Sequence, residues 1–414
     1  MAARRRIAAS IFGDNLRLRL AALICLSAIL AMAPMAHGQT MTALHNFTNQ
    51  ADGGTPVAGV TFDQQGRIYG TASSGGSHRS GLVYRLAREG EGWVSSPLYS
   101  FGSQQQDGAN PYARVVFGPG GLLYGTTFNG GTNGAGTVFS LRPPATACKT
   151  AVCPWLETVL YSFTGDADGA APAYGDLVFD RAGNIYGTTF FGGSFGAGTV
   201  FKLTRSGSGW TESVLWTFTG NDDGGFPYSG VILDNAGNLY GATNIGGADH
   251  SGTVYELSPS QSGWSETTLY SFTGEYGDGA GSLIMDGRGN LFGIAGGFTN
   301  PSSGAYELKP QNGNWSFALL QSFANEYTSP VAAPAFDAQG NLYGPLPTVN
   351  DGNGEIFKLT PAGNEWVYSP FYQFNGFNGS TPIGAVTFDA NGNMYGTVSA
   401  GGTGGYGTVW EITP

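Results

Sequence analysis

The sequence predicts an all-β fold, a seven-bladed β-propeller with four antiparallel strands in each blade. Three observations support this prediction: one motif recurs seven times, each copy contains four strand-like stretches, and the N-terminal region supplies a strand that the last copy lacks. An aromatic residue marks each copy, and successive copies lie 51 to 62 residues apart, a period typical of a repeat architecture. These residues are Tyr69, Tyr124, Tyr186, Tyr240, Phe292, Tyr343 and Tyr395.

The copy at residues 175–218 shows how one repeat divides into strands. Four apolar or alternating stretches, at 176–180, 184–188, 199–203 and 210–218, are separated by turn residues. Between the first two stretches, the Asp180 side chain can accept hydrogen bonds from turn amides, and Gly183 can adopt a positive φ. We therefore expect a tight hairpin there, with a structural Asp. The Asp recurs as Asp63, Asp234, Asp286, Asp337 and Asp389, and Gly118 replaces it in the second repeat.

The two ends of the repeat region are expected to close the ring. Residues 44–47, Leu-His-Asn-Phe, match the fourth stretch of other repeats, such as 160–163, whereas the last repeat ends without a fourth stretch of its own. The N-terminal segment can therefore complete the last blade as its outer strand, which removes an open sheet edge.

Residues 1–38 have the pattern of a secretory signal peptide. Five Arg residues precede or flank the apolar run 20–36, and small residues follow near Gly38. An uncleaved anchor is the alternative, because the run is just long enough to span a membrane. With cleavage, residues 39–414 form a single propeller domain of an exported protein, either periplasmic or extracellular.

Charge and cysteine content exclude several classes of partner. Without residues 1–38 the chain has 13 basic and 28 acidic side chains, a net charge of −15, which repels nucleic acid and anionic membranes. Cys148 and Cys153 lie close together in an insertion, and we expect a local disulfide in an exported protein. A zinc site is the alternative, but no nearby His or Cys completes four ligands. Because the chain also lacks a phosphate loop and a zinc-binding His pair, we expect no cofactor and no metal.

The repeat resembles a known family in its motifs. These are the segment 183–189, Gly-Asn-Ile-Tyr-Gly-Thr-Thr, the pair Gly192 and Gly193, the segment 198–203, Gly-Thr-Val-Phe-Lys-Leu, and Asp168-Gly169. On these motifs the region from about 43 to 412 is similar to the GloVer (Gloeo-Verruco) tandem-repeat family of exported bacterial proteins. The resemblance implies export, and it implies no particular activity.

Loops on one face of the propeller are the expected binding surface. The Asp-Gly-x-x-Pro segments that lead into the first strands and the Gly-Gly segments that follow Tyr-Gly-Thr should emerge on the same side, which we call the loop face. Aromatic residues among glycines and amides there suit sugars, although the same rings could simply pack between blades. The predicted ligand-binding residues are Tyr112, Tyr174, Phe190, Phe191, Tyr228, Tyr276, Tyr327 and Tyr406.

One aligned position near the axis carries charge in two neighbouring repeats. Counted from the turn Asp, it is occupied by Gly59, Arg114, Asp176, Gly230, Ser282, Ala333 and Ala385. Arg114 facing Asp176 could orient a substrate, or the two could form an ion pair that fills the channel. Asp249 and His250, in the Gly-Gly loop of repeat 4, are further candidates for catalysis.

Two functions of different class follow from these features. The first is a secreted or cell-surface binding module, a monomer without catalysis, for a polysaccharide or a cell-surface protein. The second is a carbohydrate-active hydrolase or lyase at the channel mouth, with Asp176, Arg114, Asp249 and His250 as candidate catalytic residues. A purely structural repeat protein is a third reading, because fold alone does not determine function.

Overall fold

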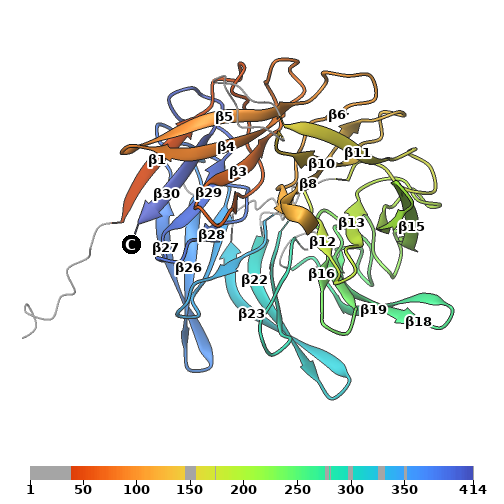
Figure 1. Cartoon of the computed structure of the whole chain (residues 1–414). Coiled ribbons are helices and arrows are strands. Elements are labelled where there is room, and N and C mark those ends of the chain that lie inside the picture. Colours follow the sequence, from red (N-terminus) through yellow and green to blue (C-terminus); the bar gives the residue numbers. More distant parts are fainter. Residues whose placement is uncertain are drawn as a thin grey trace, which may run out of the picture. The chain divides into compact units, whose positions relative to one another are not determined.

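The computed structural model describes residues 39–144, 155–172, 174–275, 279, 281–296, 302–324, 332–348 and 352–413. Met41–Thr413 forms one compact unit, and its seven four-stranded antiparallel sheets confirm the predicted propeller (Figure 1). The predicted signal peptide, Cys148 and Cys153 fall outside the described residues. Within these ranges, no helix combines the length and the hydropathy needed to cross a membrane.

Each blade contains four strands that follow one another outward in the sheet. Blade 1 contains β2 (Thr61–Phe62), β3 (Ile68–Ala72), β4 (Leu82–Glu89) and β5 (Gly92–Ser100). Blade 2 contains β7 (Val116–Phe117), β8 (Leu123–Thr127), β10 (Thr137–Arg142) and β11 (Leu156–Ser162), with the short helix η1 (Pro119–Gly121) after β7. Blade 3 contains β12 (Val178–Phe179), β13 (Ile185–Thr189), β14 (Thr199–Ser206) and β15 (Gly209–Thr217). Its strands match the four stretches predicted for this repeat.

The remaining blades repeat the same order. Blade 4 contains β16 (Ile232–Leu233), β17 (Leu239–Ala242), β18 (Thr253–Ser260) and β19 (Gly263–Ser271). Blade 5 contains β20 (Ile284–Met285), β21 (Leu291–Ala295), β22 (Ser302–Gln311) and β23 (Asn314–Ala324). Blade 6 contains β24 (Ala335–Phe336), β25 (Leu342–Leu346), β26 (Glu355–Ala362) and β27 (Glu365–Gln373). Blade 7 contains β28 (Thr387–Phe388), β29 (Met394–Val398), β30 (Thr408–Thr413) and β1 (Thr40–Asn46). A short pair, β6 (Gly108–Ala109) and β9 (Asn129–Gly130), lies on the loop face of blade 2.

The glycine of Tyr-Gly-Thr makes room for the core of each blade. In blade 3, Gly187 lies opposite Phe201 across the β13–β14 pair, and a Cβ on Gly187 would lie 2.7 Å from the Phe201 ring. The ring therefore covers the glycine and is itself fully buried. The same cross-strand pairing of glycine with an aromatic residue recurs in every blade; the aromatic partners in blade order are Tyr84, Phe139, Phe201, Tyr255, Tyr306, Phe357 and Trp410.

The motif tyrosines join neighbouring blades and close the ring. Tyr124 of blade 2 packs edge to face on Phe179 of blade 3, with 5.0 Å between centroids. Tyr395 of blade 7 makes the equivalent contact with Phe62 of blade 1 at 4.8 Å. The closing strand is β1, which is the outer neighbour of β30. Figure 1 shows β1, in red, beside β30, in blue. The predicted closure is therefore confirmed.

The Asp-x-x-Gly turns have the predicted structural role. Asp180 Oδ1 accepts hydrogen bonds from the amides of Ala182 and Asn184, each at 2.9 Å, and Oδ2 accepts one from the Tyr186 hydroxyl at 3.0 Å. Although partial burial acts in the opposite direction, these donors lower the pKa of Asp180 below its ordinary value. Gly183 has φ of 83°, as expected for this turn.

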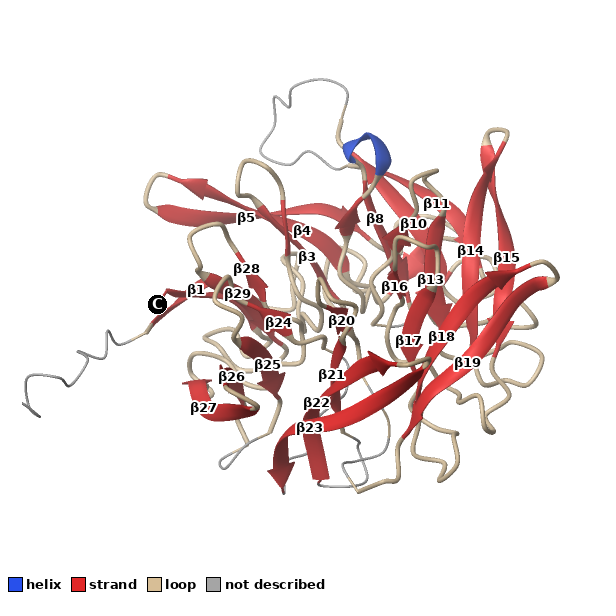
Figure 2. Cartoon of the chain, turned by 90° about the horizontal axis from the view of Figure 1, so that it is seen from below, coloured by secondary structure: helices blue, strands red, loops and turns tan. Residues whose placement is uncertain are grey.

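Three partly buried carboxyl pairs, which we call the acidic joints, lie between neighbouring blades near the outer strands. Glu212 on β15 is close to Asp168, which lies in the connection that leads into blade 3. Burial, and secondarily the charge of Asp168, raise the pKa of Glu212 to about 7. Glu157 with Asp107 and Glu266 with Asp223 form the other two joints, and each Glu again has a pKa of about 7. The three Glu residues lie on β11, β15 and β19, the fourth strands of blades 2 to 4. Figure 2 shows these strands on the outside of the propeller and first strands such as β20 and β24 on the inside.

Candidate functional site

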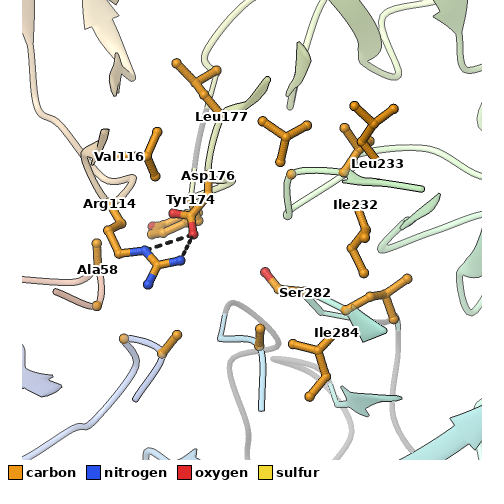
Figure 3. Close-up of a pocket in the computed structure, with 18 of the residues that line it drawn as sticks. Ala58, Arg114, Val116, Tyr174, Asp176, Leu177, Ile232, Leu233, Ser282 and Ile284 are labelled. Carbon is orange, nitrogen blue, oxygen red and sulfur yellow. Dashed lines mark hydrogen bonds and ion pairs between the residues drawn. The ribbon is translucent and has the colours of Figure 1, made fainter. Parts of the chain in front are cut away.

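A cavity of about 570 Å³ lies where the first strands begin, and all seven blades contribute to its wall (Figure 3). The residues at the aligned sequence position all line it; they are Gly59, Arg114, Asp176, Gly230, Ser282, Ala333 and Ala385. The alignment therefore identified an actual ring of residues around the axis. A volume of this size is within the range of ~300–1,000 Å³ typical of small-ligand pockets.

The charged side chains of the cavity form one ion pair. Arg114 donates from Nε to Asp176 Oδ2 at 2.9 Å, and its Nη2 donates to the same oxygen. The attraction of Asp176 raises the pKa of Arg114 above its ordinary value, and burial opposes this effect. The side chains remain 28% and 32% exposed, so both are accessible from the cavity. Within the described part of the chain, Asp176 Oδ1 accepts no hydrogen bond and is free to accept one from a ligand.

The wall opposite the ion pair is apolar. Ile232 and Leu233 lie across the cavity from Arg114 and Asp176, Ile284 lies beside them, and the Ser282 hydroxyl is between the two sides (Figure 3). The repeat has thus become an unequal pocket: blades 2 and 3 contribute the charged side chains, and the described lining residues of the other blades are uncharged.

Three tyrosines stand beside the ion pair on the loop face. Tyr112, Tyr174 and Tyr228 occupy the position two residues before the aligned ring in blades 2, 3 and 4. Their rings stack in sequence, with 5.2 Å between centroids and interplanar angles of 16° and 17°. Burial raises the pKa of Tyr174 above its ordinary value, so its hydroxyl stays protonated. Because the rings stack on one another, their faces are partly covered, in contrast to the open ring faces expected from the sequence.

A strained turn holds each tyrosine in place. In each of the three blades a proline precedes the tyrosine, and the residue before that proline has a positive φ. The values are 57° at Asn110, 52° at Ala171 and 52° at Phe226. Two backbone hydrogen bonds hold Phe226 in this conformation, one donated to Ala197 O at 2.8 Å and one accepted from Asn244 N at 3.2 Å. Since Ala197 belongs to blade 3 and Asn244 to blade 4, the turn fixes the tyrosine between two blades.

Two phenylalanines extend the stack outward along the loop face. Phe190 packs on Tyr228 with 4.6 Å between centroids, and Phe191 packs on Phe190 at 4.5 Å. Phe191 is 43% exposed, so part of its ring is open to a ligand. Five of the predicted ligand-binding residues therefore form one continuous aromatic arrangement, Tyr112, Tyr174, Tyr228, Phe190 and Phe191, which leads from the cavity toward the edge of blade 3.

The other predicted site residues lie elsewhere. Asp249 and His250 are exposed in the Gly-Gly loop of blade 4 and do not line the cavity. The structure therefore does not bring them together with Arg114 and Asp176. Tyr406 lies in the Gly-Gly loop of blade 7, away from blades 2 to 4. Tyr276 and Tyr327 fall outside the described residues. Among the residues that the structure describes, no three potential metal ligands cluster together.

Sequence reasoning missed the apolar wall of Ile232, Leu233 and Ile284. These residues belong to first strands, where apolar residues are expected for packing alone, so no pattern distinguishes the ones that face the axis. It also missed that the tyrosines stack on one another. The signal for the stack was present, because the position two residues before the aligned ring is Tyr in three consecutive repeats and aliphatic at Val57 and Ile383.

The comparisons with known proteins concern family and fold. Residues 28–154 and 153–347 match the family model of the Gloeobacter/Verrucomicrobia repeat. No curated protein matches the chain. A candidate 6-phosphogluconolactonase from Bacteroides uniformis has 16% identity and a TM-score of 0.50, over 80% of this chain and 87% of its own. A polysaccharide lyase, Uly1, has 10% identity and a TM-score of 0.49, over 92% and 94%. At such identities the likeness concerns the fold alone.

Proposed function

The chain belongs to the Gloeobacter/Verrucomicrobia repeat family, and we propose that it is an exported binding module that holds a neutral glycan on its loop face. The observation that carries this proposal is the Arg114–Asp176 pair in the axial cavity, which Tyr174 also lines. Export follows from the predicted signal peptide at residues 1–38 and is part of the proposal.

The polar groups of the cavity suit sugar hydroxyls. A hydroxyl both donates and accepts hydrogen bonds, and the site offers both partners: the guanidinium of Arg114 and the tyrosine hydroxyl donate, and Asp176 Oδ1 accepts. The aliphatic side chains of Ile232 and Ile284 on the opposite wall can contact the C–H groups of the same ring. A ligand with polar and apolar edges therefore matches both sides of the cavity.

Electrostatics favour a neutral glycan over an acidic one. The Asp176 carboxylate already compensates the charge of Arg114, so the described lining residues offer no free cation to a uronate or a sulfate. The whole chain also has a formal net charge of −11, which disfavours the approach of a polyanion. Neutral hexoses or pentoses are thus the better fit.

The catalytic alternative needs groups that the described lining does not contain. Hydrolysis by two acids needs a pair of carboxyl groups about 5 to 10 Å apart, and Asp176 is the single acidic side chain among the described lining residues. A lyase needs a base, and the described lining residues include no His or Lys that could act as one. These observations favour binding without turnover.

A glycan array with the purified protein tests the proposal, followed by calorimetry and product analysis on each glycan that binds. The double variant Arg114→Gln/Asp176→Asn keeps hydrogen-bonding side chains without leaving a buried charge, and we expect it to weaken binding by about tenfold, or ~1.4 kcal/mol. Phe377→Ala is the control, since this 90% exposed aromatic lies on a loop before blade 7. Failure to bind any neutral glycan would refute the proposal, and products that disappear with Asp176→Ala would establish the enzyme instead.

A further inference from the structure

We infer that the axial cavity receives the end of a glycan chain, and that the following sugar units lie along an aromatic track, Tyr174–Tyr228–Phe190–Phe191. The inference rests on the proposed function and adds the way in which the glycan is recognised. It distinguishes a protein that recognises chain ends from one that binds anywhere along a polymer.

The enclosure of the cavity is the first argument. Residues from all seven blades line it, so the wall surrounds the axis on every side. The middle of a long chain cannot enter such a pocket sideways, because the chain would have to leave through the wall in two directions. A chain end can enter along the axis from the loop face.

The composition of the cavity is the second argument. Every glycosidic bond consumes a hydroxyl group, so a terminal sugar has one more free hydroxyl than the units behind it. The free Oδ1 of Asp176 and the donors of Arg114 lie within one ion pair, where they can pair with adjacent hydroxyls of that terminal sugar. An ion pair that a ligand covers without supplying such partners opposes binding, which favours the more hydroxylated end.

The aromatic track is the third argument. Tyr174 lines the cavity and stacks on Tyr228 at 5.2 Å. Contacts of 4.6 and 4.5 Å then lead through Phe190 to Phe191. The track does not extend onto blades 7 and 1, which have Ile383 and Val57 where blades 2 to 4 have tyrosine. A chain whose end is in the cavity would therefore leave over blades 3 and 4.

Linear neutral oligosaccharides of defined length test the inference; the probes are the gluco-, manno-, galacto- and xylo-oligosaccharide series. Each is immobilised through its reducing end, through its non-reducing end, or through both. We expect binding with one end free and a loss of about tenfold or more when both ends are tethered. Equal binding to chains without a free end would overturn the inference and leave the proposed function intact, whereas no binding to any series would overturn the proposed function itself.

Two variants then separate the cavity from the track. Phe191→Ala should weaken the binding of long oligosaccharides by about tenfold and leave that of the monosaccharide within about twofold. Arg114→Gln/Asp176→Asn should weaken both, and Phe377→Ala neither. Circular dichroism and thermal unfolding confirm that each variant is folded. If Phe191→Ala weakens monosaccharide and oligosaccharide binding equally, the assignment of Phe191 to units behind the end is wrong.

Discussion

The acidic joints predict that this propeller loses stability as the pH rises through neutrality, and Glu212→Gln tests the prediction. Glu212 Oε1 is buried and has no hydrogen-bond partner among the described residues, and Asp168 adds a like charge nearby. Ionisation of Glu212 is therefore unfavourable in the folded protein. Glutamine has almost the same shape and stays neutral at every pH, so the substitution removes the cost of ionisation without removing the side chain.

The magnitude follows from the shift in pKa. Glu212 has an ordinary pKa of 4.5 and a pKa of about 7 in the folded protein. Because the folded pKa is the higher one, the contribution to stability is complete below pH 4.5 and is lost as the pH rises to about 7. The full shift corresponds to roughly 3 kcal/mol. Because the side chain is partly exposed and water screens its charge, we expect about 1 kcal/mol.

Thermal unfolding at low ionic strength, followed by circular dichroism at about pH 5 and about pH 8, measures this effect. We expect Glu212→Gln to match the parent protein at the lower pH and to exceed it by about 1 kcal/mol at the higher pH. The triple variant with Glu157→Gln and Glu266→Gln should gain about 3 kcal/mol, because the three joints lie between different blades. The control is Glu365→Gln at an exposed position. A difference between variant and parent that is the same at both pH values would refute the reasoning.

Three further predictions concern the repeat scaffold. Gly187→Ala should destabilise the protein by about 1–3 kcal/mol, because its Cβ would lie 2.7 Å from the Phe201 ring; an unchanged unfolding temperature would contradict this packing. Asn46→Ala should cost about 1–2 kcal/mol and speed hydrogen exchange in β1, since Asn46 Oδ1 accepts from Thr408 Oγ1 at 3.0 Å where the ring closes; exchange that is faster only in other blades would oppose it. His250→Gly should stabilise by ~0.5–1 kcal/mol, because φ at His250 is 57°; a destabilised variant would show that the His side chain contributes contacts of its own.

The fold was predictable because its physical requirements recur in every repeat. The Asp180 turn and the glycine opposite Phe201 each solve a local problem that every blade shares, so the same residues reappear at a fixed period. The position of Arg114 and Asp176 on the axis followed from this period. The direction of the Tyr174 ring could not be predicted from the period, because it depends on the turn around Ala171 and on the neighbouring tyrosines. Such side-chain relations between blades leave no periodic signal.

Symmetry explains why the site had to arise from departures within adjacent repeats. Seven equal positions around an axis cannot orient a ligand that has different edges, so a specific pocket needs unequal blades. Arg114 and Asp176 occupy the same position in blades 2 and 3, and neighbouring blades bring their side chains within hydrogen-bond distance. In blades that are not neighbours, the same two residues would leave two unpaired charges in a partly buried cavity, at a cost of several kcal/mol. The three stacked tyrosines must likewise lie in consecutive blades, because each ring packs against the ring of the next blade.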